Sequence, residues 1–318
     1  MSENESLFDV FLATALEAAR LAAPIIKAAF TNRTLQGTLE LKTNTADIVT
    51  QTVAFRSNAN KTKQTSQDKA VEALVMAHIR AKHPTHSFIG EETYNSSTSL
   101  TNNPTWVIDP VDGTTNFVHG FPFVCISIAL VVGKEPVVGV VLNPILEETF
   151  YARRGGVGAF LVDSTHATHE LPLHKARSKP WPGFERALLA TEYGYDRGEQ
   201  LDSKLSAITR ILKSPTRGVR SIGSAALSAC YVANGSLDAY WEAGVHMWDV
   251  AAATVIVRES GGGVANFVPV FLEDGKETLD LAQRKFIFVR AVEGGEKKVN
   301  EILELIRSNL DPVEYQAD

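Results

Sequence analysis

Apolar residues recur at helical spacing in two stretches near the start of the chain. Residues 7–30 are rich in Ala and Leu but contain charged residues at intervals. This pattern predicts an amphipathic helix rather than a membrane span. In residues 68–82 the apolar side chains fall on one face of a helix, and Asp68 stands where an N-cap or first-turn acid is expected. The chain therefore begins with two helices separated by a polar stretch.

The middle of the chain changes to short apolar runs that are typical of strands. These runs cover residues 86–90, 105–109, 122–132, 137–142, 148–153, 158–162 and 187–191. The segment Gly133–Pro136 has turn composition, so residues 122–142 are predicted to form a hairpin.

Helical and strand patterns alternate in the last third. Helices are predicted at 201–213, 224–233, 249–260 and 294–308, and strands at 217–221, 237–241 and 285–291. The three glycines at 261–263 are expected to end the third of these helices. The pattern indicates an α/β (α+β) protein with layered helices and sheets.

Composition narrows the class of protein. The chain has 318 residues, of which 44% are hydrophobic and 21% charged, so it can bury a large core. A formal net charge of -6 argues against a nucleic-acid-binding protein. Cys125 and Cys230 stand in apolar surroundings and are expected to be buried thiols, as in a reducing compartment. No secretory or membrane-spanning pattern is found, so we expect a cytoplasmic protein without a membrane partner.

Acidic residues stand at the ends of predicted elements. Glu91 and Glu92 follow the run Ser-Phe-Ile-Gly, Asp109 ends the run Trp-Val-Ile, Asp112 lies in a Pro-Val-Asp-Gly turn, and Asp249 begins a helix. Such carboxylates converge readily in space. A set of oxygen ligands without Cys or His suits a hard cation, and Mg²⁺ is the default.

The residues after Asp112 suit a phosphate group. Gly113 lets a ligand approach the backbone, and Thr114 and Thr115 offer hydroxyl and N–H donors. A helix starting here would favour an anion at its N-terminus. A metal and a phosphate side by side is the arrangement that metal-assisted phosphate hydrolysis needs.

Longer motifs resemble one known family. The segments Ile89–Glu92, Trp106–Phe117, Arg220–Ala225, Tyr240–Trp248 and Trp248–Ala252 are similar, in order, to the signature segments of the inositol monophosphatases. The resemblance implies one domain over residues 1–318 with a layered α-β-α-β-α, sugar-phosphatase-like sandwich. It also implies a lithium-sensitive, homodimeric enzyme that uses two or three Mg²⁺ ions to hydrolyse inositol monophosphate, a small phosphorylated polyol.

The resemblance also assigns site residues by motif match. The implied metal ligands are Glu91, Asp109, the Val111 carbonyl, Asp112 and Asp249. The implied substrate contacts are Asp112, Gly113, Thr114, Thr115, Gly223, Ser224, Ala225, Glu242 and Asp249. In the implied mechanism Glu91, helped by Thr114 and Asp68, takes a proton from the attacking water.

One segment departs from the family pattern. Residues 53–67 separate two parts of a motif that would otherwise be continuous, and they are polar without hydrophobic period. We expect either a natural exposed loop or an intron retained in the gene model, and transcript sequencing distinguishes the two.

Other functions remain open at this point. Within the superfamily the substrate could be a sugar phosphate or a nucleotide bisphosphate, or the protein could be a fungal relative associated with quinate metabolism. Glu242 argues against a second anionic group on the substrate. In a different class, the chain would be a catalytically inactive regulatory homologue, but all five implied metal positions are filled.

Overall fold

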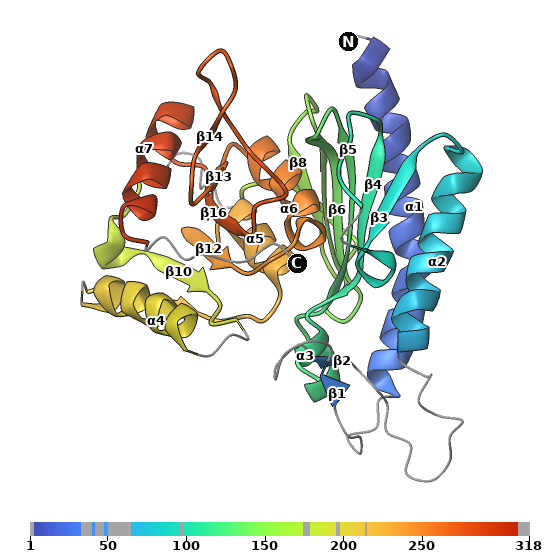
Figure 1. The fold of residues 1–318 in the computed structure, drawn as a ribbon, viewed down its shortest axis with the longest axis horizontal. Coiled ribbons are helices and arrows are strands. Elements are labelled where there is room, and N and C mark those ends of the chain that lie inside the picture. Colours follow the sequence, from blue (N-terminus) through green and yellow to red (C-terminus); the bar gives the residue numbers. More distant parts are fainter. Residues whose placement is uncertain are drawn as a thin grey trace.

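Two large β-sheets and three layers of helices alternate through the described part of the chain, which also has two small two-stranded sheets (Figure 1). The computed structural model describes residues 3–32, 40–41, 48–49, 65–95, 98–173, 179–194, 198–213 and 215–310. The order of layers is α1 and α2, a seven-stranded sheet, α5 and α6, a five-stranded sheet, and then α4 and α7. This is the α-β-α-β-α sandwich that the sequence led us to expect.

The first sheet carries the N-terminal half of the chain. Its strands, in spatial order, are β3 (Ser87–Gly90), β4 (Thr105–Asp112), β5 (Cys125–Val132), β6 (Glu135–Asn143), β7 (Glu148–Arg153), β8 (Ala159–Val162) and β9 (Thr168–Glu170). β3 and β4 are parallel, and the other neighbours are antiparallel. α1 (Glu3–Thr31) and α2 (Thr65–Lys82) cover one face, and α6 (Met247–Glu259) covers the other. Because both faces are covered, β5 and β6 are almost continuously apolar and buried.

The second sheet is mixed. Its order is β11 (Gly218–Arg220), β10 (Leu188–Thr191), β12 (Ala239–Ala243), β16 (Lys285–Val289) and β13 (Gly263–Asn266). β10 runs parallel to both β11 and β12, so the carboxyl ends of these three strands meet at one edge. α5 (Ala225–Ala233) lies with α6 between the sheets, while α4 (Glu199–Leu212) and α7 (Gly295–Arg307) pack outside.

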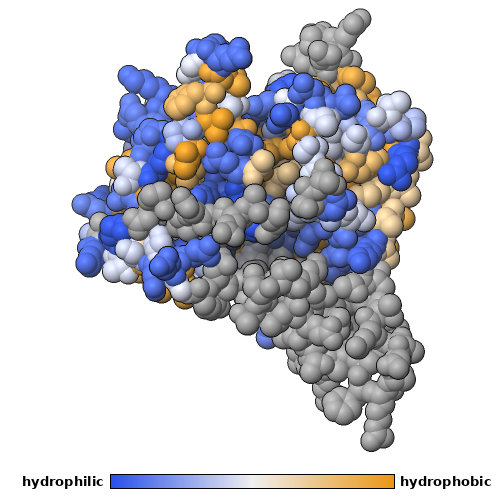
Figure 2. All heavy atoms as spheres, in the orientation of Figure 1, coloured by the Kyte–Doolittle hydropathy of each residue, from blue (hydrophilic) through white to orange (hydrophobic). Residues whose placement is uncertain are grey.

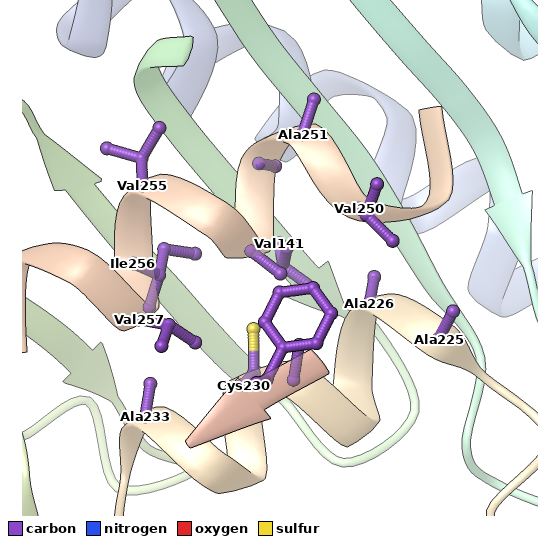
Figure 3. Close-up of a cluster of buried hydrophobic side chains, with 14 of the residues drawn as sticks. Val141, Ala225, Ala226, Cys230, Ala233, Val250, Ala251, Val255, Ile256 and Val257 are labelled. Atoms are coloured by element: carbon purple, nitrogen blue, oxygen red, sulfur yellow. The ribbon is translucent and has the colours of Figure 1, made fainter. Parts of the chain in front are cut away.

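Small side chains allow close packing in the central helical layer (Figure 3). α5 and α6 contribute Ala226, Ala251 and other small apolar residues to the largest buried cluster. On the sheet side, a Cβ added at Gly139 of β6 would lie 2.1 Å from the Ala252 carbonyl oxygen. Any larger residue at this position would therefore push α6 away from the sheet.

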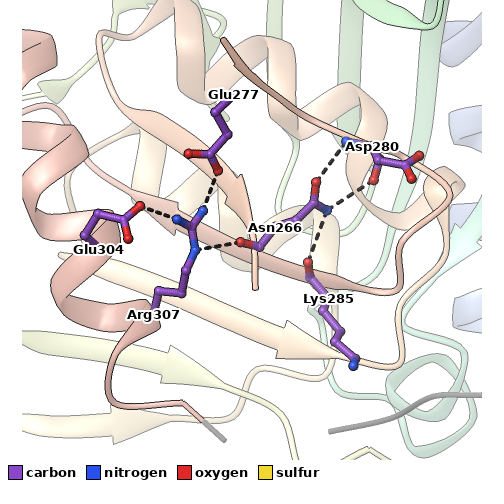
Figure 4. A network of polar contacts seen from close by, with 6 residues as sticks. All are labelled: Asn266, Glu277, Asp280, Lys285, Glu304 and Arg307. Carbon is purple, nitrogen blue, oxygen red and sulfur yellow. Dashed lines mark hydrogen bonds and ion pairs between the residues drawn. The ribbon is translucent and has the colours of Figure 1, made fainter. Parts of the chain in front are cut away.

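A polar network ties the last helix to the second sheet (Figure 4). Arg307 of α7 donates to the Asn266 carbonyl at 3.1 Å and pairs with Glu277 at 2.6 Å. The fully buried Asn266 side chain donates in turn to the carbonyls of Asp280 and Lys285. Because charge-assisted bonds of this kind are directional, the network fixes α7 and the loop that leads into β16.

The surface view is mainly hydrophilic, with limited apolar areas (Figure 2). One such area lies over the hairpin of β14 (Val270–Phe271) and β15 (Glu277–Thr278), where Val268, Phe271 and Leu272 are exposed. Within the described part of the chain, no helix combines the length and the apolarity needed to cross a membrane.

The predicted helices and strands are present, with three corrections. β4 continues through Asp112, although the sequence pattern placed Asp112 in a turn. β13 starts at Gly263, a glycine that was expected only to end a helix. α2 begins at Thr65, so the last three residues of the expected 53–67 loop are helical, and residues 53–64 lie outside the described residues. Short strands such as β9, β14 and β15 were not predicted, because two or three residues are too few to show a period.

Candidate active site

A β-bulge brings Asp109 and Asp112 together. In the β4–β5 pairing Asp109 is opposite Ser127 and Asp112 is opposite Cys125, so three residues of β4 match two of β5. In a regular strand, residues three apart point to opposite faces. The extra residue removes that opposition and turns both carboxylates to the same side. Pro110 sits inside the irregularity, where a missing N–H is tolerated.

Asp249 reaches the same place from the first turn of α6. Its Oδ2 accepts the His246 N–H at 2.7 Å, which caps the helix, and the His246 ring stacks on Trp248. Ser127 of β5 donates to the Trp248 carbonyl at 3.0 Å and so ties the start of α6 to the sheet. Carboxylate oxygens of Asp109, Asp112 and Asp249 all lie within 4.8 Å of one another.

Glu91 is placed beside this cluster by the parallel pairing of β3 with β4. Gly90 is opposite Ile108, so Glu91, the first residue of the 3-10 segment Glu91–Thr93, follows next to Asp109. Burial raises the pKa of Asp109 most, and the charge of Glu91 and a hydrogen bond between the two side chains raise it further. Four carboxylates thus share one end of the first sheet.

Glu72 holds the short segment that carries Glu91, although the sequence pattern alone did not single it out. It lies on α2, is only 1% exposed, and its Oε2 accepts the Glu92 N–H at 2.9 Å. A Cβ added at Gly90 would lie 2.3 Å from the Glu72 carboxyl carbon, so only glycine lets the side chain pass. The signal for Glu72 in the sequence was that a charged residue lies on the apolar face of the predicted helix, where it needs a buried partner.

Burial and mutual repulsion dominate the electrostatics of the cluster. Burial first, and then neighbouring carboxylates, raise the pKa values of Asp109 and Asp249 well above the ordinary value. Burial also raises the pKa of Asp112, but less, because the Ser224 hydroxyl and the Ala226 N–H donate to it. A divalent cation would offset this repulsion, and an all-oxygen donor set without His or Cys fits Mg²⁺.

The phosphate-binding candidates follow at the end of β4. Gly113 adopts a left-handed conformation (φ 88°) and begins the short helix α3 (Thr114–His119). A Cβ there would lie 2.6 Å from the Phe123 carbonyl oxygen. The Thr114 hydroxyl donates to the Val111 carbonyl at 3.2 Å, and Thr115 is the next residue of the helix. Because the N–H groups of a first helical turn have no acceptor within the helix, anions bind readily at helix N-termini.

The polyol-contact candidates come from α5 and β12. Ser224 is the N-cap of α5, and its hydroxyl donates to Asp112 Oδ2 at 2.5 Å. Gly223 precedes it with a φ of 77°, and Ala225 is the first residue of the helix. Glu242 of β12 accepts a hydrogen bond from the Tyr240 hydroxyl. Burial and then the charge of Glu192 raise the pKa of Glu242 well above its usual range.

Glu192 and Cys125 lie close to the site, and Asp68 lies on the helix that carries Glu72. Asp68 lies in the first turn of α2, the helix that also contacts the Glu91–Thr93 segment. Glu192, directly after β10, was not predicted, although it ends a strand just as the other acids do. The thiol of Cys125 lies 3.7 Å from Asp112 Oδ2, and both cysteines are buried and free, as expected.

Comparison with known proteins gives a consistent picture. The family model described as "Inositol monophosphatase family" matches residues 8–292. Inositol monophosphatase 1 of Sus scrofa is 38% identical over 291 residues, which cover 91% of this chain and 92% of the relative. Inositol monophosphatase 2 of Saccharomyces cerevisiae is 43% identical over 206 residues, 62% of this chain and 67% of the relative. The structure of an inositol monophosphatase from Anabaena (Nostoc) sp. PCC 7120 superimposes with a TM-score of 0.69 at 28% identity, over 97% of this chain and 98% of that one.

Proposed function

Because the chain belongs to the inositol monophosphatase family and is a phosphoric monoester hydrolase, we propose that it hydrolyses inositol monophosphate to inositol and phosphate with Mg²⁺. The observation that carries this proposal is the convergence of Asp109, Asp112 and Asp249 within 4.8 Å. Three buried or half-buried carboxylates at this spacing repel one another strongly, so the arrangement suits a cation and a phosphate rather than a neutral ligand.

The same residues would hold the metal. We assign two or three Mg²⁺ ions to Glu91, Asp109, the Val111 carbonyl, Asp112 and Asp249. The Val111 oxygen already accepts the Thr114 hydroxyl, and a carbonyl oxygen retains a second lone pair for a cation. Bound Mg²⁺ would lower the pKa of a water and neutralise charge on the phosphate.

Protein groups would carry out the proton transfer and hold the phosphate. Glu91, with Thr114 and Asp68 in support, takes the proton of the attacking water. Backbone N–H groups at Gly113, Thr114 and Thr115 hold the phosphate oxygens at the start of α3. This arrangement keeps the phosphorus beside the carboxylate cluster while the water oxygen bonds to it and the ester oxygen leaves, taking up a proton from solvent to give the free hydroxyl.

The polyol side of the site favours an uncharged leaving group. Ser224 and Ala225 border the cluster, and Glu242 offers a carboxylate that can accept substrate hydroxyls. Glu192 adds a second carboxylate close enough to raise the pKa of Glu242. Two acids here disfavour a second phosphate on the substrate, which favours inositol monophosphate over nucleotide bisphosphates. A sugar phosphate, or the substrate of a quinate-associated relative, remains the second candidate because these molecules also present several hydroxyls.

Three further properties of the proposal follow from the family. We propose that the enzyme is inhibited by lithium, assembles as a homodimer and works in the cytoplasm on inositol phosphates. Size-exclusion chromatography with light scattering tests the dimer, and titration of LiCl into the assay tests inhibition.

A phosphate-release assay tests the proposed activity. The panel contains inositol 1-phosphate, a sugar phosphate and a nucleotide bisphosphate, each with MgCl₂ and with EDTA. We expect Mg²⁺-dependent release with the highest kcat/KM for inositol 1-phosphate. Equal release with EDTA would refute metal dependence, and a clear preference for a bisphosphate would refute the role given to Glu192 and Glu242 in excluding a second phosphate.

A further inference from the structure

The loop between β11 and α5 is bound from one side by the end of β10. Glu192 Oε1 accepts the N–H groups of two consecutive residues, Ile222 at 2.6 Å and Gly223 at 2.8 Å. The Ser221 hydroxyl donates to the Thr191 carbonyl at 2.8 Å. Three consecutive residues of the loop are therefore tied to Thr191, the last residue of β10, and to Glu192, which follows it.

The same loop is bound from the other side by α3. Asn116 is 9% exposed, and its Nδ2 donates to the Ile222 carbonyl at 2.8 Å and to the Phe123 carbonyl at 2.9 Å. A side-chain amide has two N–H donors, so both are used. Ile222 thus has its N–H held by Glu192 and its carbonyl held by Asn116.

This double attachment fixes the position of Ser224, which contacts the carboxylate cluster. Gly223 has a left-handed φ of 77°, and a Cβ there would lie 2.8 Å from Asn116 Oδ1, so the loop is packed tightly on α3. Ser224 follows at once, and its hydroxyl donates to Asp112 Oδ2. The direction in which Asp112 presents its other oxygen therefore depends on where this loop sits.

We propose that Glu192 is a positioning residue for hydrolysis: with Asn116 it clamps Ile222 and Gly223, and so sets the Ser224 hydroxyl against Asp112. The clamp aligns the polyol-contact loop, which belongs to the second sheet, with the phosphate and metal residues, which belong to the first. Glu192 acts through its acceptor oxygen and not through its charge. The inference rests on the proposed function, because it concerns the same reaction.

Three substitutions separate the acceptor from the charge. Glu192→Gln keeps an oxygen at the same reach and loses the charge, Glu192→Asp keeps the charge and shortens the reach, and Glu192→Ala loses both. We expect Glu192→Gln to keep kcat within about threefold of the wild type. Glu192→Asp and Glu192→Ala should lower kcat by about tenfold to a hundredfold, with a smaller change in KM. Glu185→Ala, in an exposed 3-10 turn, is the matched control and should change neither parameter.

A second measurement does not depend on turnover. The rise in melting temperature on adding MgCl₂ reports how well the carboxylate cluster is arranged for a cation. It should be preserved in Glu192→Gln and reduced in Glu192→Asp and Glu192→Ala. Wild-type protein that gains stability with MgCl₂ but releases no phosphate would refute the proposed function and leave the clamp testable by this measurement.

The order of the variants distinguishes positioning from a role of the charge. Higher kcat for Glu192→Asp than for Glu192→Gln would show that the charge matters and would overturn the positioning role. Wild-type kcat and wild-type Mg²⁺ response in Glu192→Ala would also overturn it. If the Ala variant does not fold, the comparison of Gln with Asp still separates the two roles.

Discussion

Replacing Asp112 by Asn removes one negative charge from the carboxylate cluster but keeps the shape of the side chain. Asp112 Oδ2 accepts hydrogen bonds from the Ser224 hydroxyl at 2.5 Å and from the Ala226 N–H at 2.9 Å. An amide oxygen can accept the same two bonds. The N-terminus of α5 therefore stays docked, and we expect Asp112→Asn to fold.

The structure gives the size of the electrostatic change. Two unit charges 4.8 Å apart repel by about 3 kcal/mol at an effective dielectric constant of about 20. Asp112 has two such neighbours, Asp109 and Asp249, although protonation already relieves part of this repulsion in the metal-free protein. We therefore expect a net gain of about 1–3 kcal/mol without metal, which raises the melting temperature by a few degrees. The Mg²⁺-induced rise, about 3 kcal/mol for the wild type at a hundredfold excess over Kd, should largely disappear.

The activity of Asp112→Asn should fall, although its stability without metal should rise. If Asp112 holds the cation as proposed, its loss should lower kcat/KM by about a thousandfold, or about 4 kcal/mol of transition-state stabilisation. Phosphate release and thermal unfolding, each with MgCl₂ and with EDTA, measure the two effects. Asp274→Asn, in the exposed turn between β14 and β15, makes the same chemical change as a control. Near-normal turnover of Asp112→Asn would refute the assignment of the site.

Three other predictions follow from the packing and the charges. Glu72→Ala should lower the free energy of unfolding in urea by about 1–3 kcal/mol and also lower kcat, because the Glu92 N–H loses its acceptor; an unchanged kcat would contradict the support of Glu91. Gly139→Ala should cost about 1–3 kcal/mol in the same unfolding experiment, since the new methyl group meets the α6 backbone. In EDTA, Asp109 and Asp249 should contribute fully to the free energy of unfolding below the ordinary Asp pKa of about 4. This contribution should be lost as the pH rises through the raised pKa values of the two residues in the folded protein. Melting temperatures across pH should therefore fall more steeply in EDTA than in MgCl₂, and equal slopes would contradict this reasoning.

Periodic burial explains why much of the fold could be predicted. α2 presents one apolar face to the first sheet, and β5 and β6 are buried on both faces, so their sequences show helical spacing and continuous apolar runs. β13 was missed because its first residue, Gly263, belongs to a glycine run. A Cβ there would lie 2.4 Å from Val299 of α7, so the glycine is needed for packing that only the assembled fold shows.

The acids of the candidate site could be singled out from the sequence, but the way in which the fold brings them together could not. The acids at Glu91, Asp109, Asp112 and Asp249 stood out because they end strands or begin helices. The bulge that turns Asp109 and Asp112 to one side depends on a register shift against β5, which local sequence does not encode. Glu192 escaped notice for a similar reason: its partners, two backbone N–H groups, lie 30 and 31 residues away in the chain.

The three aspartates of the cluster share one mode of attachment, and this bears on how a cation would bind. In each, one carboxylate oxygen accepts a nearby backbone N–H: Val111 for Asp109, Ala226 for Asp112 and His246 for Asp249. Each residue offers one ligand oxygen within 4.8 Å of the others. Because backbone groups of β4, α5 and α6 fix the side chains, little rearrangement is needed when a cation binds. In a pre-organised site, little of the binding free energy of the metal is lost in ordering side chains. More of it can therefore offset the repulsion between the carboxylates.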